Sequence, residues 1–352
     1  MLLIGAIDGL IEMSGSQGPI TATTVFSRKD SKIPSQFAEP CFNATEVQFI
    51  ELIGKKLHTS YYAFQSGGYI TEDLSLKGEH IGSKSPIKQV AYADTPNRII
   101  WALRNDGTLA SLTYAPEQQL KGWASHVIGG NTVAVKCIDT IPGANYTELW
   151  AVVSRVINGS TVKTVEVMAQ EFGDYDDPTS AFFLDSGQTY NGSPATTITG
   201  LSRLNGETVQ VIADGAAHPD CVVGSGQITL NSAASVVTVG YNSPAIFQSL
   251  DLEGGGQFGA SSTQNAAIFE IGVNFLNTLG CSEGTDINHL VPIVFTTNLQ
   301  NMDTAPSLYT GPYTLKYIGG YSNKYGATIV QTQPLPITIL NIVYKAKVSD
   351  FV

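Results

Sequence analysis

The sequence contains few charged residues, and cationic ones are especially scarce. Only 14% of its 352 residues are charged, and 19 Lys and Arg stand against 30 Asp and Glu, for a formal net charge of −11. Disorder needs high net charge with low hydrophobicity, whereas 43% of this chain is hydrophobic. Electrostatic binding of nucleic acid needs a basic patch, and Lys and Arg form no cluster in this sequence. The simplest explanation of the negative net charge is solubility. The alternative explanation is that the protein has a surface that must not bind a polyanion.

Cysteines are few and far apart. Cys41, Cys137, Cys221 and Cys281 include no C-x-x-C pair, so we expect thiols that are free and partly buried, without a zinc site or a dense disulfide framework. The sequence also lacks an apolar run of the ~18 residues that a membrane span needs. The first residues have no basic region and reach an acid at Asp8, so we expect neither a signal peptide nor stable membrane insertion.

Sustained helical periodicity with caps is missing as well, and the pattern that is present indicates antiparallel strands. The 35 Gly and 16 Pro fall between short apolar runs, as turn residues do in all-β proteins. Residues 98–103 and 109–114 flank a turn at 105–107, and residues 148–155 and 161–167 flank Asn158-Gly159, a strong hairpin signal. Repeated hairpins that each carry a Trp predict propeller-like blades or a large meander, with the Trp side chains filling the core.

Residues 181–241 read as a separate small β-module. An apolar run at 182–184 stops at a turn signal, Asp185-Ser186-Gly187, and the strand 208–212 ends at Asp214-Gly215. Residues 236–239 are expected to form a further strand. The whole chain is therefore predicted to be all-β. Residues 1–180 would form propeller-like blades, 181–250 an inserted small β-barrel, and 251–352 a C-terminal β-region that closes the body.

Catalytic machinery is not visible in the sequence. Asp174, Asp176 and Asp177 form the densest acidic run and could ligate calcium, but further spaced ligands are missing, and a solvated turn is favoured. The histidines, His58, His80, His126, His218 and His289, show no metal-ligand spacing. Neither a G-x-S-x-G elbow nor a phosphate-binding loop is present. Ser-His-Asp triads and carboxylate pairs assemble in space and stay open. We predict no enzyme and no catalytic, cofactor-binding or metal site.

Several segments resemble a known family of virion proteins. Residues 181–192, 200–230 and 233–241 are similar to the insert of the tail nozzle, or tail tubular B, proteins of short-tailed bacteriophages. That insert is often labelled by its likeness to the first-catalytic-cysteine half-domain of ubiquitin-activating enzymes, which describes a fold, and Cys221 is not carried over as catalytic. Further segments resemble the family in its order: 61–81, 99–126, 148–168, 307–313 and 331–343.

The resemblance implies a structural protein of the phage tail. A ring, hexameric in the family, would continue the DNA channel below the portal and adaptor, with DNA only in transit and with adaptor and tail fibre proteins as neighbours. Assembly would take place in the bacterial cytoplasm, and no cofactor is implied. Family members are about twice as long, so either a separate chain supplies an N-terminal half or this form is shortened.

Two other functions stay open. A tail fibre or receptor-binding protein would be trimeric and carry a shaft repeat, and a tail polysaccharide depolymerase would show a solenoid of short repeats. The sequence shows neither repeat.

Overall fold

The protein is nearly all β. The computed structural model has 62% strand and 5% helix, which confirms the all-β prediction. The chain divides into two compact units, Met1–Gln170 and Glu171–Val352. The finer predicted division at residues 180 and 250 stays a prediction. The structure describes residues 2–15, 19–43, 45–173, 176–251, 255–256, 259–260, 265–295, 306–316, 321–322 and 326–348.

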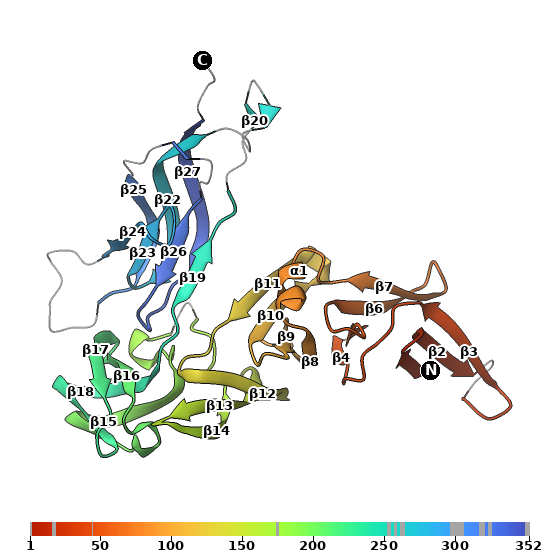
Figure 1. The fold of residues 1–352 in the computed structure, drawn as a ribbon, viewed down its shortest axis with the longest axis horizontal. Helices are drawn as coiled ribbons and strands as arrows, with labels where there is room; N and C mark the ends of the chain where they lie inside the picture. Colours follow the sequence, from red (N-terminus) through yellow and green to blue (C-terminus); the bar gives the residue numbers. More distant parts are fainter. Residues whose placement is uncertain are drawn as a thin grey trace. The chain divides into compact units, whose positions relative to one another are not determined.

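Unit 1 is built from four antiparallel sheets, and in each the strands follow chain order (Figure 1). The N-terminal sheet contains β1 (Leu2–Ala6), β2 (Gly9–Gly15) and β3 (Val25–Ser31). The second sheet contains β4 (Cys41–Asn43), β5 (Glu46–Ile50), β6 (Leu57–Ala63) and β7 (Gly68–Asp73). The middle sheet contains β8 (Ile87–Ala93), β9 (Ile99–Arg104), β10 (Leu109–Ala115) and β11 (Leu120–His126). The hairpin sheet contains β12 (Asn131–Pro142), β13 (Thr147–Ile157) and β14 (Ser160–Val167). Short helices α1 (Glu79–Lys84) and η1 (Pro116–Gln118) connect strands.

The middle sheet is buried on both of its faces. On one face, Ile100 and Leu112 share a core with Leu57 of the second sheet. On the other face, Trp101 shares a core with Leu149 of the hairpin sheet. Trp101 is thus a core residue, as predicted, and Trp123 packs against the first of these cores, whereas Trp150 belongs to neither. Sheets that follow one another in sequence therefore pack as successive layers, while the closed propeller-like arrangement stays a prediction.

The hairpins of unit 1 form where the sequence predicts them. β1 and β2 pair up to Ala6 opposite Gly9, with Ile7 and Asp8 in the turn, and β13 and β14 pair from Ile157 opposite Ser160. Asn158 and Gly159 have φ values of 46° and 75°, the left-handed pair that a two-residue hairpin turn requires.

Unit 2 begins with an open sheet, which corrects the predicted small barrel. The insert sheet has the order β15–β18–β16–β17, from β15 (Asp185–Thr199), β18 (Gln227–Tyr241), β16 (Thr208–Ala213) and β17 (Ala216–Val222). No closed barrel is found among the described strands, because β15 pairs only with β18 and β17 only with β16. Helices η2 (Pro178–Ser180) and η3 (Ser202–Leu204) flank β15.

Two strand boundaries of the insert sheet differ from the prediction. β15 begins at Asp185, where a turn was expected, because Ser186 forms a bulge with φ 48° inside the strand. The Arg203 guanidinium holds this bulge by donating to the Ser186 side chain (2.6 Å) and to the carbonyls of Ser186 (2.5 Å) and Gly187 (3.1 Å). Residues 236–239 are not a separate strand but the second half of β18.

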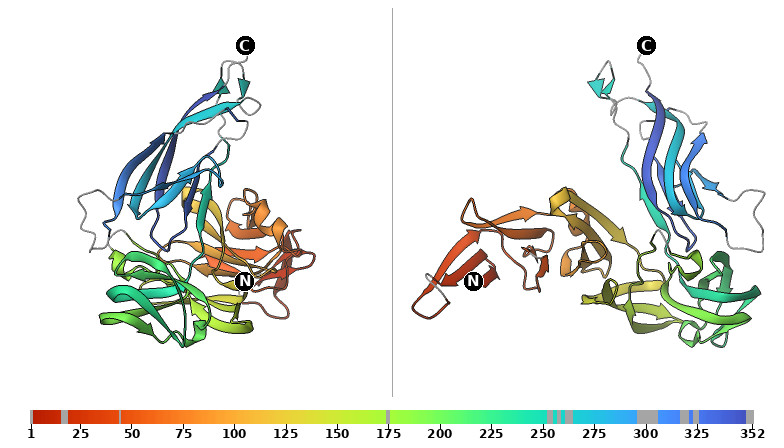
Figure 2. Two further views of the ribbon diagram at one scale, coloured as in Figure 1. Left: turned by 60° about the vertical axis from the view of Figure 1, so that its left-hand side comes forward. Right: turned by 180° about the vertical axis from the view of Figure 1, so that it is seen from behind.

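The rest of unit 2 is a two-sheet sandwich (Figure 2). One sheet has the order β19–β26–β23–β24, from β19 (Ala245–Gln248), β26 (Thr328–Gln331), β23 (Cys281–Gly284) and β24 (Leu290–Ile293). The other has the order β25–β22–β27, from β25 (Tyr309–Lys316), β22 (Ala266–Thr278) and β27 (Ile339–Val348). A short pair is formed by β20 (Gly255–Gly256) and β21 (Gly259–Ala260). Phe275 of one sheet and Ile329 of the other lie in one core.

Candidate functional site

The described carboxylates of the acidic run before the insert sheet, Asp176 and Asp177, each accept a hydrogen bond from the backbone. The Asp176 carboxylate accepts a hydrogen bond from the Gly173 N–H (2.7 Å), and the Asp177 carboxylate accepts one from the Thr179 N–H (2.9 Å) at the start of η2. These bonds from Thr179 lower the pKa of Asp177. Asp174, the third predicted calcium ligand, lies outside the described residues. Both described carboxylates thus bind the backbone of neighbouring residues.

The histidines are not brought together, but one of them meets a serine. His126 Nε2 lies 2.7 Å from the Ser111 hydroxyl, and its ring packs against Trp101. Burial lowers the pKa of His126, and no carboxylate contributes to that shift. A serine nucleophile needs a base that a third group orients. No carboxylate in the described chain is bonded to His126, so this pair lacks the orienting member of a triad.

A second pair joins His218 and Cys221 on β17. Cys221 Sγ lies 3.7 Å from His218 Nδ1, which also lies 2.7 Å from the Pro219 carbonyl. His218 Nε2 accepts the Asn231 N–H at 3.0 Å, which leaves Nδ1 as the ring nitrogen that carries a proton. Burial and the Asp220 charge raise the pKa of Cys221, whereas a reactive cysteine needs a lowered one. The pair therefore does not supply an activated thiolate.

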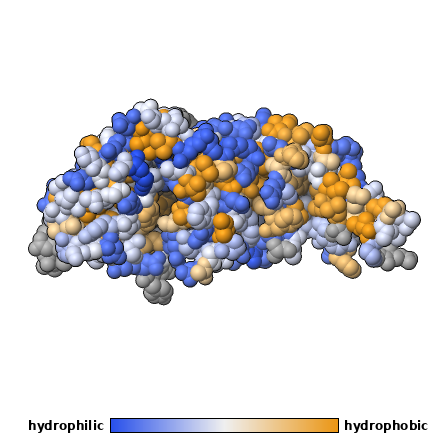
Figure 3. Space-filling model, turned by 90° about the horizontal axis from the view of Figure 1, so that it is seen from below, coloured by the Kyte–Doolittle hydropathy of each residue, from blue (hydrophilic) through white to orange (hydrophobic). Residues whose placement is uncertain are grey.

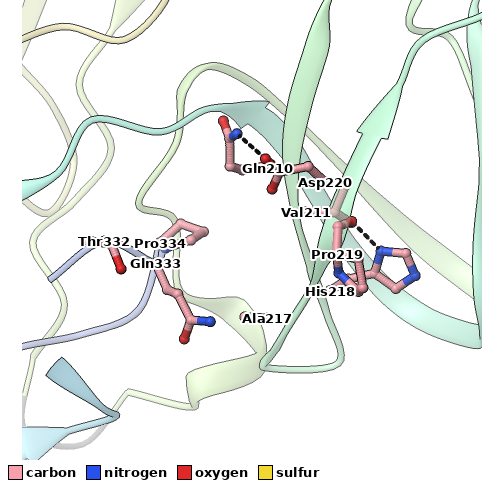
Figure 4. A pocket seen from close by; sticks show the side chains of 9 residues that line it. All are labelled: Gln210, Val211, Ala217, His218, Pro219, Asp220, Thr332, Gln333 and Pro334. Atoms are coloured by element: carbon pink, nitrogen blue, oxygen red, sulfur yellow. Dashed lines mark hydrogen bonds between the residues drawn. The ribbon is translucent and has the colours of Figure 1, made fainter. Parts of the chain in front are cut away.

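A cavity of about 300 Å³ lies beside this pair (Figure 4). Its lining includes Gln210, Asp220 and Gln333. Gln210 donates to the Asp220 carboxylate at 3.1 Å and accepts the Asn242 N–H at 2.9 Å, so its amide is satisfied within the protein. Another cavity, of about 340 Å³, lies at one end of the sandwich. There Gln331 donates to the carbonyls of Leu279 and Gly280, and burial raises the pKa of Cys281 to about 12.

A buried polar chain, which the sequence analysis did not identify, ties the second sheet to the middle sheet. Gln48 donates to the Thr59 hydroxyl at 3.4 Å, and Thr59 donates to Glu46 at 2.7 Å. The same Glu46 oxygen accepts the Tyr114 hydroxyl at 2.7 Å. Burial and Glu46 raise the pKa of Tyr114, which keeps the phenol protonated as a donor. This series of hydrogen bonds connects the second sheet to the middle sheet.

The N-terminal sheet carries an apolar face. Directly opposed residues of antiparallel strands share a face, and the β1–β2 register pairs Leu2 with Met13 and Ile4 with Ile11. With Val25 of β3, these residues form what we name the N-terminal face. Leu2 is 53% and Val25 42% exposed, and the others are half-buried. Figure 3 shows hydrophobic side chains gathered over the first strands of unit 1.

The hairpin sheet carries a second apolar face, on the side away from the middle sheet. The register places Trp150 opposite Val167 and Val152 opposite Val165. With Ile141 of β12, these residues form what we name the hairpin face. Val165 is 67%, Ile141 49% and Val167 45% exposed. Sequence reasoning missed both faces, because strands with apolar residues on both sides have the pattern of buried strands.

The described part of the chain offers no candidate metal site, and the chain matches no family model. In the described part of the chain, no group of three or more His, Cys, Asp and Glu side chains could hold a metal ion. The described residues contain no helix long and apolar enough to cross a membrane. All four cysteines are free thiols, as predicted. No family model and no curated protein matches the chain.

Proposed function

We propose that the chain is a structural component of a bacteriophage tail, a ring-forming nozzle or tail-tube protein that continues the DNA channel. The observation that carries the proposal is the pair of exposed apolar sheet faces in unit 1. Large exposed apolar patches mark surfaces that other proteins cover. A protein that works as part of an assembly needs such faces, and one of the segments that resemble the tail nozzle family, residues 148–168, runs through the hairpin sheet.

The charges of the chain fit a channel that DNA leaves. Many of the few cations are already engaged by carboxylates, as in the pairs Lys56–Asp73, Arg98–Glu117 and Arg155–Glu166. Each phosphate contact made by Lys or Arg adds to the affinity for DNA. A wall that is acidic and poor in unengaged cations makes few such contacts, so DNA slides along it. This part of the proposal requires the carboxylates to line the lumen.

Gold-labelled antibody against the purified chain tests the proposal on intact virions. Label on the tail axis, below the head, is the expected result. Label on projecting fibres would instead support a tail fibre or receptor-binding protein, and unlabelled tails would contradict both. Release of reducing sugar from the host capsule by the purified chain would support a depolymerase.

A further inference from the structure

We infer that the cavity beside β16 and β17 binds a small organic cation through an alkylammonium group. This is the cavity of about 300 Å³ whose lining includes Gln210, Asp220 and Gln333. A cavity of this volume lies at the lower limit of those that take small-molecule ligands. The inference does not rest on the proposed function, because it concerns a site within unit 2 of a single copy.

Two walls of unit 2 enclose the cavity (Figure 4). Gln210 and Asp220 lie on strands of the insert sheet, whereas Thr332 and Gln333 follow the end of β26. Asn242 connects the two walls, because its N–H donates to the Gln210 side chain at 2.9 Å and its side-chain amide donates to the Thr332 carbonyl at 2.5 Å. The cavity is therefore built by one copy of the chain.

Asp220 supplies a carboxylate that is oriented but not neutralised. Gln210 donates to one of its oxygens at 3.1 Å, and Gln210 is itself fixed by the bond that it accepts from Asn242. An amide is uncharged, so this bond orients the carboxylate and leaves its charge in place. Within the described chain, no Lys or Arg forms an ion pair with Asp220, and none lines the cavity. The second oxygen of this carboxylate is available to a cation.

The opposite wall adds two hydrogen-bond acceptors. Thr332 and Gln333 are exposed, and neither side chain is hydrogen-bonded to another described residue. An alkylammonium group has three N–H donors and no acceptor. In the cavity it donates to the second oxygen of Asp220, to the amide oxygen of Gln333 and to the hydroxyl of Thr332.

The rest of the lining suits a short carbon chain. Val211 and Pro334 are buried, Ala217 is half-buried, and Pro219 adds a further apolar ring. His218 also borders the cavity, but its two ring nitrogens already lie against the Pro219 carbonyl and a backbone N–H. These residues pack against the carbon atoms of the ligand while its ammonium group meets the three oxygens.

The charge of the lining selects the class of ligand. An anion would face the Asp220 carboxylate, and the described lining has no Lys or Arg to bind it. A cation gains a charge-assisted hydrogen bond, which is roughly twice as strong as a bond between neutral groups. An alkylammonium ion should therefore bind more tightly than a neutral molecule of the same shape. Its source is either a free amine or the side chain of a lysine on another protein.

Titration of the full chain, labelled with nitrogen-15 and observed by two-dimensional NMR, tests the inference. The probe is n-butylamine, and n-butanol is its neutral control of the same shape. Saturable shifts of signals from the lining residues are expected with n-butylamine and not with n-butanol, and added salt should weaken the binding. Nα-acetyl-lysine methylamide separates the two sources. Binding at least about tenfold tighter than that of n-butylamine would indicate a lysine side chain, and equal or weaker binding would indicate a free amine.

Variants on both walls identify the site. Asp220→Asn removes the charge but keeps an oxygen that accepts from Gln210, and it should weaken n-butylamine binding about tenfold. Gln333→Leu removes an acceptor at an exposed position, and it should weaken the binding about two- to fivefold. Asp139→Asn, at an exposed carboxylate of unit 1, is the matched control and should leave the binding unchanged. An unchanged melting temperature verifies that each variant folds, and Gln333→Leu carries the test if Asp220→Asn does not fold.

Three results would each overturn the inference. They are equal binding of n-butylamine and n-butanol, unchanged binding in the folded variants of both walls, and the absence of a saturable shift among the lining residues. None of them bears on the tail function, which antibody labelling of virions tests separately.

Discussion

Arg155 is a fully buried cation, and each of its three guanidinium nitrogens donates a hydrogen bond. Its Nε donates to the Gly129 carbonyl at 2.9 Å, and its two terminal nitrogens bind both oxygens of Glu166. It thereby ties the segment before β12 to the β13–β14 hairpin. The side chain has 1% exposure, so its charge depends entirely on these partners.

Removal of this side chain should strongly destabilise unit 1. Arg155→Ala leaves the mostly buried Glu166 carboxylate without its counter-ion, which costs about 3–5 kcal/mol of unfolding free energy. Urea unfolding measures the change. Lys163→Ala on the same hairpin, an exposed site, should change it by less than about 0.5 kcal/mol. Equal effects of the two substitutions would refute a structural role for the ion pair.

The buried histidines make stability depend on pH. Burial lowers the pKa values of His58 and His126 below the ordinary 6.5. Below pH 6.5 the unfolded chain binds protons that the folded chain resists, so the unfolding free energy should fall as the pH drops from about 7 to about 5. Carboxylates whose pKa is lowered, such as Asp73, whose ordinary pKa is 3.8, affect the unfolding free energy only at lower pH.

Urea unfolding at several pH values measures this dependence. The double variant His58→Gln/His126→Gln should flatten it, whereas His80→Gln, at an exposed position, should not. An unchanged slope in the double variant would show that other groups cause the dependence.

The cysteine thiols should differ in how fast they react with an alkylating reagent. Cys137 is exposed, whereas burial raises the pKa values of Cys41 and Cys281 to about 12. Thiolate is the reactive form, so in the dissociated folded chain Cys137 should alkylate first and the two buried thiols only after unfolding. Mass spectrometry of the labelled peptides measures the order. Early labelling of Cys41 or Cys281 would contradict their burial.

At the scale of elements, the turns were predicted from sequence more reliably than the strand limits. Asn158-Gly159 and Asp214-Gly215 gave hairpins because few other residues adopt positive φ at little cost. The start of β15 was missed because the bulge at Ser186 depends on Arg203, a residue distant in sequence. The N-terminal face and the hairpin face were missed for a similar reason. The side of a strand that a neighbouring sheet covers is decided by packing and not by the strand's own pattern.

The β13–β14 turn permits a direct test of this reasoning. Gly159 has φ 75° and open space where a Cβ would stand, so Gly159→Ala adds only backbone strain, about 1–2 kcal/mol. Gly122→Ala on β11 also meets open space but has no positive φ, and it should cost less. Thermal unfolding of both variants compares them. A Gly159→Ala variant as stable as Gly122→Ala would contradict the turn geometry.

At the scale of the whole molecule, the sequence predicted the all-β class and the structure shows it. The tail function and the propeller-like closure stay proposals. They depend on what covers the two apolar faces and on whether the acidic side chains line a channel. Both questions concern the assembly and not the single chain.

Electron microscopy of the phage tail, with copies of the chain counted around the tail axis, tests the central claim most directly. The account predicts a closed ring, hexameric as the resemblance implies, around an open channel. A trimer on a projecting fibre, or the absence of the chain from the tail axis, would contradict it.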